Sequence, residues 1–270
     1  MIAHRGANDT EPEHSVAAYL RAIEQGANAV ECDVRLTMDG TLVCIHDRRI
    51  NRTSSGRGTV SSQFHSELDL SDFSGSLENW MDYEDPRPDE SRTRLLTLET
   101  LLTLVLDKSP EIQFSIETKH PVRYGKYVEL ELYEVLKRHG LANTPRARVM
   151  SFSRRAIQRY KELAPLTDVV FLQERVARKY RDGTLPTGVS ISGIDIDYIR
   201  KNPEYVELTH QKGGKVHVWT VDYIPDVDFC MELGVDAIIT NQPGKIIAHI
   251  NNADPIEALA SQINHGRSNL

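Results

Sequence analysis

The sequence of 270 residues contains few cysteines and no long apolar run. Its three cysteines, Cys32, Cys44 and Cys230, cannot all pair with one another, and each has apolar neighbours. We therefore expect buried, reduced thiols, as in proteins of a reducing compartment. No segment approaches the ~18 apolar residues that a membrane-spanning helix needs, and no basic-then-apolar leader precedes Ile2. These absences predict a cytoplasmic protein without a membrane span.

The sequence also lacks an excess of positive charge. It has 32 Lys and Arg residues against 39 Asp and Glu residues, which gives a net charge of −7. Because binding to a nucleic-acid backbone depends on clustered Lys and Arg, we expect no nucleic-acid partner. An acidic protein can still bind one phosphate group locally, above all where a divalent cation changes the sign of the local charge.

The proportions of apolar and charged residues are typical of a globular domain. Hydrophobic residues make up 40% of the sequence and charged residues 26%. A chain of this length fits one large domain, and α/β barrels of about 250 residues are common. We predict a single domain over residues 1–270. The sequence leaves the oligomeric state open, including a homo-oligomer.

Short apolar segments alternate with amphipathic ones, and this alternation predicts parallel strands connected by helices. Residues 15–25, for example, place Val16, Leu20 and Ile23 on one helical face, and Gly26 follows as a helix stop. Further helices are expected after Thr97 and over residues 124–139, 153–163, 203–211 and 225–233. The predicted strands cover residues 2–3, 29–34, 42–45, 113–116, 148–151, 168–172, 188–191, 215–220 and 237–240.

These nine strands are one more than a TIM (β/α)8 barrel contains. The Asp39-Gly40 pair accounts for the surplus, because Asp-Gly between two apolar segments predicts a hairpin. The strand over 42–45 would run antiparallel to its predecessor and carry His46 toward the barrel mouth. We therefore predict an α/β fold, a TIM barrel with this strand added.

Residues 48–94 interrupt the alternation. The segment is polar, rich in Ser, Asp and Gly, and too long for a plain strand-to-helix connection. We interpret it as a small insertion after the second strand unit that forms a lid over the barrel mouth. Its apolar residues would form a small core of the insertion or, less favoured, a channel for acyl chains; they are Phe64, Leu68, Leu70, Phe73, Trp80 and Met81.

Acidic side chains stand at the ends of two predicted strands. Glu31 and Asp33 are two residues apart, so they point to the same face, and Glu117 ends another strand. In a parallel barrel these strand ends open at one mouth, where three carboxylates suit one divalent cation, Mg²⁺ or Ca²⁺. The alternative is that they form structural ion pairs with Arg5 and Lys119. We favour the metal, because three converging carboxylates repel one another unless a cation compensates them.

Two histidines, His4 and His46, also end predicted strands, and a charged residue follows each. Imidazole titrates near neutral pH, so the pair suits proton transfer in catalysis. Arg5 and Lys119 are candidates for holding a phosphate group. Trp219 ends a strand and either supports a small polyol or packs at the rim.

Several motifs occur in order over residues 1 to about 243. They are His4-Arg5-Gly6, Pro12-Glu13, Glu31-x-Asp33, Asp39-Gly40, His46-Asp47, Arg52-Thr53 with Gly56-x-Gly58, Leu96-Thr97-Leu98-Glu99, Glu117-x-Lys119, Val218-Trp219-Thr220-Val221 and Gly234-Val235-Asp236-Ala237-Ile238-Ile239-Thr240-Asn241. With this series the chain resembles the glycerophosphodiester phosphodiesterases. It departs from the usual pattern at His14 and Ser15, where the family commonly has Asn and Thr, and at Asn241, which replaces a frequent Asp.

The resemblance implies a TIM barrel with an insertion after the second strand unit. It also implies hydrolysis of a small-molecule glycerophosphodiester to sn-glycerol 3-phosphate and an alcohol. The implied roles are acid–base catalysis for His4 and His46, one divalent cation at Glu31, Asp33 and Glu117, phosphate binding for Arg5 and Lys119, and glycerol contact for Trp219. By analogy with the family, the nucleophile is the C2 hydroxyl of the substrate, which forms a cyclic phosphate, although direct attack by water stays open.

Other questions stay open at this point. They include which histidine acts as the acid, whether the metal is Mg²⁺ or Ca²⁺, and which alcohol is released. A lysophospholipase D or sphingomyelinase D-like phosphodiesterase on the same fold is the nearest alternative, and it needs an apolar channel for acyl chains. A non-catalytic barrel that binds a phosphorylated ligand is a weaker alternative, because it would not need both histidines.

Overall fold

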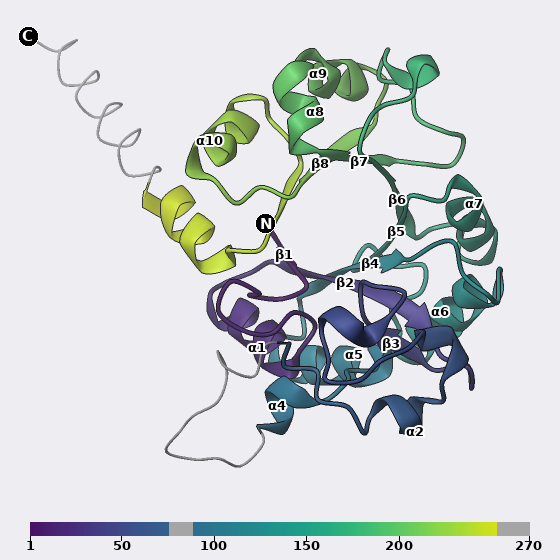
Figure 1. The fold of residues 1–270 in the computed structure, drawn as a ribbon. Coiled ribbons are helices and arrows are strands. Elements are labelled where there is room, and N and C mark those ends of the chain that lie inside the picture. The colour runs from purple at the N-terminus through teal and green to yellow at the C-terminus, as the bar shows by residue number, and fades with distance from the viewer. Residues whose placement is uncertain (76–88, 253–270) are drawn as a thin grey trace, which may run out of the picture.

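Eight parallel strands form a closed barrel with the helices arranged outside it (Figure 1). The computed structural model describes residues 1–75 and 89–252. The order of strands around the ring is β1-β9-β8-β7-β6-β5-β4-β2, and pairing of β1 with β2 closes it. The strands are β1 (Ile2–His4), β2 (Ala29–Leu36), β4 (Gln113–Thr118), β5 (Ala147–Ser151), β6 (Asp168–Gln173), β7 (Ile191–Asp195), β8 (Lys215–Trp219) and β9 (Ala237–Thr240). The predicted TIM barrel is confirmed.

The added strand, β3 (Leu42–Cys44), is antiparallel to β2, with Cys44 opposite Val34. The turn between them includes Gly40, whose φ of +86° is a conformation that glycine adopts without a steric penalty. After β3, the backbone N–H of Ile45 donates a hydrogen bond of 3.0 Å to the carbonyl oxygen of Asp33. The hairpin therefore delivers the next residue, His46, to the mouth of the barrel, as predicted.

The outer helices lie close to the predicted positions. Ser15, Thr97 and Ser153 each accept a hydrogen bond from a backbone N–H of the first turn and so cap the helices that follow them. The longer helices are α1 (Val16–Glu24), α5 (Leu98–Lys108), α6 (Tyr127–Arg138), α7 (Arg154–Leu163), α9 (Glu204–Gln211) and α10 (Ile224–Glu232). Residues 243–252 are also helical.

The structure differs from the prediction at β7 and at the helix that follows it. The strand expected over residues 188–191 was wrong, because Gly188 has a φ of +80° and the N–H of Val189 donates back to the carbonyl of Pro186, which makes a turn there. The strand begins only at Ile191. The short helix α8 (Ile196–Lys201) was missed, since six residues are too few for a visible helical period.

Apolar side chains fill the inside of the barrel below the mouth. The alternation of side chains along each strand points one set inward, and this set packs as a separate cluster of Ile2, Ala29, Met150, Val170, Leu172, Ile191 and Ile239. The barrel is therefore a packed core and not a pore. Polar residues one step further along the strands lie above this layer, where the mouth is open.

The insertion has its own small core. It contains η1 (Ile50–Arg52), η2 (Val60–Ser62), α2 (His65–Leu68) and α4 (Glu90–Thr93). Leu68 and Phe73 are buried in the cluster that includes Ile50 and Val60, whereas Phe64 and Leu70 are exposed. Trp80 and Met81 lie outside the described residues. The part of the insertion that is described favours the small core, and its role as a lid stays a prediction.

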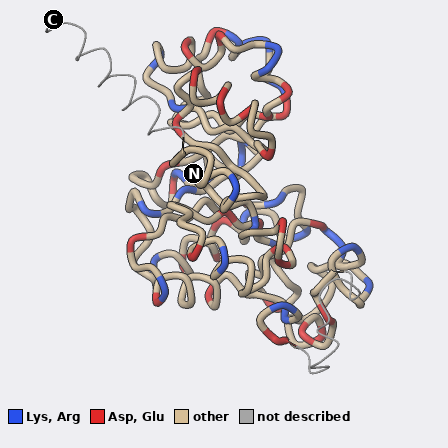
Figure 2. Tube along the Cα trace, turned by 90° about the vertical axis from the view of Figure 1, so that its left-hand side faces the viewer, with Lys and Arg blue, Asp and Glu red and all other residues tan. Residues whose placement is uncertain are grey.

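The cysteines, the helix lengths and the distribution of charge bear on the remaining expectations. All three cysteines are buried and unpaired, as expected. Among the described helices, none has the length and apolar character needed to cross a membrane. Basic and acidic residues are interspersed along the described trace and are not sorted onto separate faces (Figure 2).

Candidate active site

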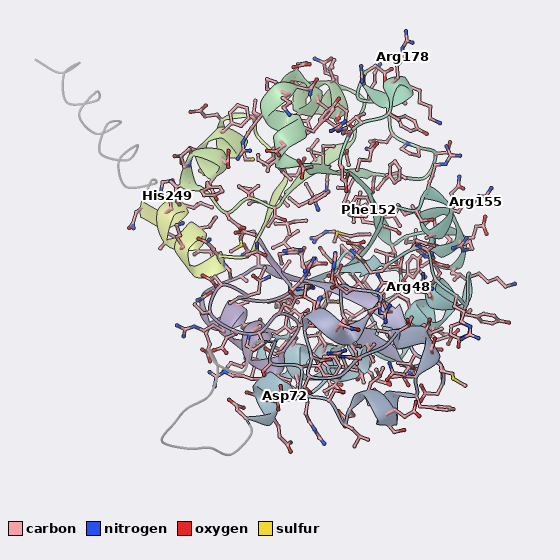
Figure 3. All side chains as sticks on the ribbon, in the orientation of Figure 1. Arg48, Asp72, Phe152, Arg155, Arg178 and His249 are labelled. Carbon is pink, nitrogen blue, oxygen red and sulfur yellow. The ribbon has the colours of Figure 1, made fainter. Side chains whose placement is uncertain are left out.

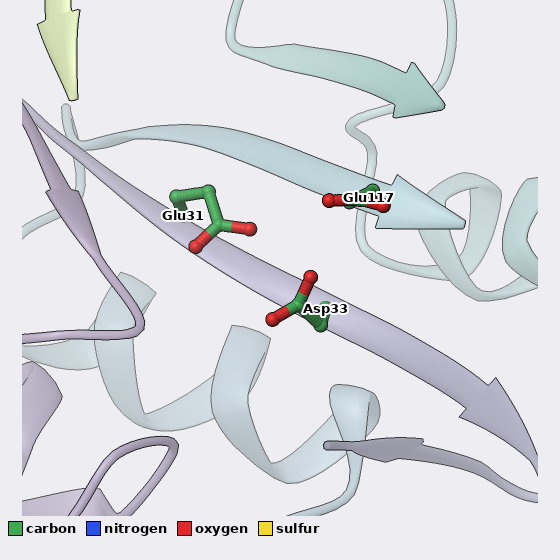
Figure 4. A group of neighbouring side chains, drawn as sticks. All are labelled: Glu31, Asp33 and Glu117. Atoms are coloured by element: carbon green, nitrogen blue, oxygen red, sulfur yellow. The ribbon is translucent and has the colours of Figure 1, made fainter. Parts of the chain in front are cut away.

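The register of neighbouring strands brings the predicted acidic residues together. His4 on β1 pairs with Glu31 on β2, and Asp33 on β2 pairs with Glu117 on β4. The three carboxylates are buried and offer oxygen atoms that all lie within 4.8 Å of one another (Figure 4). Adjacent parallel strands thus bring together acidic residues that are as far apart in the sequence as Glu31 and Glu117, which are separated by 86 positions.

Basic side chains contact this cluster unevenly. Asp33 receives most of them, with Arg5 Nε at 2.9 Å, His14 Nε2 at 3.0 Å and Lys119 Nζ at 3.2 Å. The other oxygen contact of Lys119 is to Glu117, at 2.9 Å. Within residues 1–75 and 89–252, Glu31 accepts a hydrogen bond only from the backbone N–H of Arg5, at 3.0 Å, and it lies 4.0 Å from the ring of His4. The structural ion pairs expected as the alternative to a metal are therefore present, but they compensate mainly Asp33.

The remaining acidic charge fits a bound divalent cation. Burial first, and then the charge of Asp33, raises the pKa of Glu31 well above its ordinary range and the pKa of Glu117 to about 8. Two of the three carboxylates are therefore not stable as anions beside each other without a further positive charge. Three convergent carboxylate oxygens are the hard ligands that Mg²⁺ and Ca²⁺ prefer. The donor set fits the predicted metal, and the ion pairs with Arg5 and Lys119 do not exclude it.

His4 lies at the edge of the cluster with a neutral partner behind it. Its Nδ1 is 2.6 Å from Oδ1 of Asn241, whose Nδ2 donates to Asp222 at 2.7 Å. Burial first, and then the charge of Arg5, lowers the pKa of His4 to about 4. The imidazole is therefore held neutral, with its Nε2 on the cavity side.

His46 has a charged partner. Its Nδ1 lies 2.7 Å from Oδ1 of Asp47, and Nε of Arg52 donates to the second oxygen of Asp47, also at 2.7 Å. The same guanidinium donates two hydrogen bonds to Glu13, at 2.7 and 2.8 Å. The Arg52 hydrogen bond is the main reason why the pKa of Asp47 falls to about 2. Arg52 thus connects the loop after β1 with the loop that carries His46.

One cavity of about 340 Å³ opens beside these groups at the barrel mouth. Of the predicted site residues, seven line it: His4, Arg5, Glu31, His46, Glu117, Lys119 and Trp219. The eighth, Asp33, is buried against Arg5 and Lys119. The rest of the lining consists of Met150, Phe152, Leu172, Glu174, Thr220 and Ile239. The structure therefore brings all eight predicted residues to one place.

Three supporting contacts were not predicted from the sequence. They are the contacts of His14 with Asp33, of Arg52 with Glu13 and of Asn241 with His4. His14 also lies 2.8 Å from the hydroxyl of Tyr19. The departures at His14 and Asn241 from the family pattern were the only signal for two of them. No local pattern indicates the third, because Glu13 and Arg52 are 39 positions apart.

Comparisons with known proteins identify the family of this chain. A model of the glycerophosphoryl diester phosphodiesterase family matches residues 4–245. The chain belongs to this family. The predicted resemblance is thereby confirmed, and the chain is an enzyme, a phosphoric diester hydrolase.

Individual relatives match over nearly the whole chain. A probable glycerophosphodiester phosphodiesterase 1 of Mycobacterium tuberculosis is 40% identical over 259 residues, which cover 93% of this chain and 92% of the relative. A glycerophosphodiester phosphodiesterase of Caldanaerobacter subterraneus is 30% identical over 247 residues, 92% of this chain and 96% of the relative.

A solved structure shows the same fold. It is that of an Oleispira antarctica phosphodiesterase in complex with the product sn-glycerol-3-phosphate. Its TM-score is 0.80 at 23% identity, and the match covers 93% of this chain and 96% of that one.

Proposed function

We propose that this member of the family hydrolyses glycerophosphodiesters to sn-glycerol 3-phosphate and an alcohol with the help of one divalent cation, Mg²⁺ or Ca²⁺. One observation carries the proposal: His4 and His46 line the same cavity as Glu31 and Glu117. A site that only bound a phosphorylated ligand would not need two imidazoles beside the acidic cluster. The sn-glycerol-3-phosphate bound as product by the Oleispira antarctica phosphodiesterase supports the same product class.

Glu31, Asp33 and Glu117 would hold the cation. When bound, it would supply charge neutralisation for phosphate oxygens in a diester that otherwise repels nucleophiles. Arg5 and Lys119 line the same cavity and would bind the remaining phosphate oxygens, Arg5 through its fork and Lys119 as a point charge. Because both side chains are also paired with Asp33, their positions are already set before substrate enters.

The two imidazoles would transfer the protons. One removes a proton from the attacking hydroxyl, and the other protonates the oxygen of the leaving alcohol. Each ring is tied through Nδ1, to Asn241 in one case and to Asp47 in the other, so Nε2 is the atom available in the cavity. Trp219 would lie beside the glycerol group. Either the C2 hydroxyl of the substrate or a water molecule would serve as the nucleophile.

A chelator-controlled assay tests the proposal. The purified protein is stripped of metal, supplied with Mg²⁺ or Ca²⁺, and given a panel of glycerophosphodiesters, and the phosphorylated product is identified. We expect sn-glycerol 3-phosphate, formed only with metal. Phosphocholine as the product of glycerophosphocholine would show cleavage on the other side of phosphorus and overturn the proposal.

The metal ligands can be tested without turnover. Calorimetric titration of Ca²⁺ into the stripped protein should show one site, which Glu31→Gln and Glu117→Gln weaken about tenfold or more, because each removes a charged ligand. Glu111→Gln is the matched control, since Glu111 is exposed and precedes the opposite end of β4. Equal affinity in all variants would remove these carboxylates from the metal site.

The structure does not favour the acyl-chain alternative. That function needs an apolar channel, and among the described residues of the insertion none lines the cavity. Turnover of lysophosphatidylcholine is therefore expected to be far below that of glycerophosphocholine.

A further inference from the structure

The two carboxylate oxygens of Asp33 have different surroundings. Oδ2 lies 3.0 Å from Nε2 of His14, and within the described residues only this contact to the carboxylate has the geometry of a hydrogen bond. The contacts of Arg5 to Oδ2, at 2.9 Å, and of Lys119 to Oδ1, at 3.2 Å, are ion pairs without that geometry. Oδ1 is therefore the oxygen that the protein leaves available, although it is buried.

His14 is fixed in place by its backbone and its burial. Its φ of +61° is a left-handed conformation that residues other than glycine seldom adopt. Its backbone N–H donates a hydrogen bond of 3.1 Å to the carbonyl oxygen of Arg5, and its side chain is buried. Ser15, the next residue, caps α1. A conformation of this kind persists only where the surrounding structure holds it, and it often marks a functional position.

Tyr19 on α1 connects His14 with a second candidate metal ligand. Its hydroxyl lies 2.8 Å from Nδ1 of His14 and donates a hydrogen bond of 3.1 Å to the backbone carbonyl oxygen of Glu31. Tyr19 is buried, so both contacts are shielded from solvent. One chain of contacts thus runs from the backbone of Glu31 through the two rings to the side chain of Asp33. Both acidic residues project from the same strand, β2 (Figure 4).

His14 differs from the other partners of Asp33 because it has no task in the cavity. Arg5 and Lys119 line the cavity and would bind phosphate under the proposed function, whereas His14 does not line it. A residue that hydrogen-bonds a metal ligand from outside the site orients that ligand, and its loss commonly weakens metal binding. The imidazole is therefore suited to hold Asp33 in one orientation both before and after substrate enters.

We propose that His14, supported by Tyr19, is a positioning residue of the metal site: it binds Oδ2 of Asp33 and so leaves Oδ1 oriented for the cation. This inference rests on the proposed function, which supplies the cation and its ligands. It assigns a role to a position at which this chain departs from the usual family pattern. It also predicts that metal affinity depends on two side chains that lie outside the cavity.

Calorimetric titration of Ca²⁺ into the metal-free protein tests this role. His14→Asn removes the imidazole, and the variant should fold, because the family commonly has Asn here and Asn tolerates a positive φ. The shorter side chain does not reach both Tyr19 and Asp33. Tyr19→Phe removes only the hydroxyl. We expect the dissociation constant for Ca²⁺ to rise about tenfold in His14→Asn, as for other residues that orient a metal ligand, and by a smaller factor in Tyr19→Phe.

Two matched controls separate this role from a general loss of stability. His249→Asn removes a similar imidazole–carboxylate contact, 2.6 Å to Asp228, at the outer edge of the molecule (Figure 3). Tyr160→Phe removes a buried hydroxyl on α7 that does not line the cavity. Both variants should bind Ca²⁺ as the wild type does. In His14→Asn, a raised Ca²⁺ concentration should restore kcat without changing the KM for the diester, which a merely structural role does not predict.

The outcomes separate this inference from the proposed function. Wild-type affinity for Ca²⁺ in both His14→Asn and Tyr19→Phe, together with weakened binding in Glu31→Gln, overturns the inference and leaves the proposed metal site intact. A wild type that binds neither Ca²⁺ nor Mg²⁺ overturns both. Weakened binding in His14→Asn alone would mean that Tyr19 has no part in the positioning. Equal weakening in the two control variants would show a loss of stability and overturn the positioning role.

Discussion

His4 and His46 face the same cavity, but the protein surrounds them differently. Each ring is held through Nδ1 by a side chain behind it. For His4 this is the neutral amide of Asn241, at 2.6 Å, and for His46 it is the carboxylate of Asp47, at 2.7 Å. The side chain of His4 is 19% exposed and that of His46 is 36% exposed.

This difference bears on which ring carries a proton. A carboxylate partner stabilises the imidazolium form, whereas an amide partner does not. The pKa of His4 falls to about 4, mainly through burial and the charge of Arg5. Burial also lowers the pKa of His46, but the hydrogen bond to Asp47 opposes that shift. We therefore expect His4 to start the reaction neutral, as the base, and His46 to be the ring that more readily holds a proton, as the acid.

The largest effect is expected from removing either ring. His4→Ala and His46→Ala should each lower kcat by about 10² or more, the range typical of acid–base groups. Steady-state kinetics on a glycerophosphodiester measure this. His120→Ala is the control, because His120 pairs with Glu129 and does not line the cavity. A near-normal kcat in one of the two variants would show that this histidine has no acid–base role.

The partner of His46 should have the next largest effect. Asp47→Asn keeps an acceptor oxygen near Nδ1 but removes the charge that stabilises a protonated ring, so kcat should fall about tenfold or more. Arg52→Met, which leaves Asp47 without its 2.7 Å contact, should have a smaller effect in the same direction. A positioning role predicts a lower kcat with little change in KM. A lower kcat together with a similarly raised KM would indicate direct contact with the substrate.

Exchanging the type of partner at His4 gives the sharpest test. Asn241→Asp places a carboxylate beside Nδ1 and should raise the pKa of His4, because the charged form of the ring gains an opposite charge. The limb of the pH–rate profile that belongs to His4 should move to higher pH by about one unit. The shift is limited by Asp222, which now accepts hydrogen bonds from the side chain and the backbone of Asn241 and would face a second carboxylate.

The reciprocal variant completes this test. Asp47→Asn removes an anion from His46 and should move the limb that belongs to His46 to lower pH. If the acid limb responds to Asn241→Asp and the alkaline limb to Asp47→Asn, His4 is the base and His46 the acid. The opposite pattern would reverse the two roles.

Most of the fold could be predicted because periodicity and turn residues are local signals. The Asp39-Gly40 turn identified β3 as an added antiparallel strand, and Ser15, Thr97 and Ser153 marked helix starts. β7 was misplaced because Gly188 and Val189 form a turn within a segment that reads as apolar. A local signal also fails for α8, which is only six residues long.

The main residues of the site could be predicted for a related reason, whereas the contacts that support them could not. Parallel strands of a barrel end at the same mouth, so residues such as His4, Glu31 and Glu117 could be expected together from their places at strand ends. Two of the residues that support them, His14 and Arg52, are not on those ends. Arg52 reaches Glu13 from the insertion, and only the folded positions of the two loops make that contact.

A third histidine offers the smallest expected effect on turnover and the largest on stability. His120, Glu129 and Arg159 repeat the imidazole–carboxylate–guanidinium order of His46, Asp47 and Arg52, with contacts of 2.6 and 2.9 Å. Glu129 is completely buried between helices α6 and α7, away from the cavity. Burial acts to raise the pKa of Glu129, but hydrogen bonds from His120 and Arg159 outweigh it and lower this pKa.

Glu129→Gln should therefore destabilise the fold without changing kcat at neutral pH. We expect the free energy of unfolding, measured with urea, to fall by about 2 kcal/mol at neutral pH, since two cationic or hydrogen-bonding partners lose a buried carboxylate. A carboxyl group whose pKa is lower in the folded state stabilises the fold above its unfolded-state pKa, and this contribution is lost as pH falls through the folded-state value. The difference between variant and wild type should accordingly shrink below about pH 4. A drop in kcat without a loss of stability would mean that His120 acts in catalysis as well as His46. An imidazole bound to a carboxylate would then not be a feature of the barrel mouth alone.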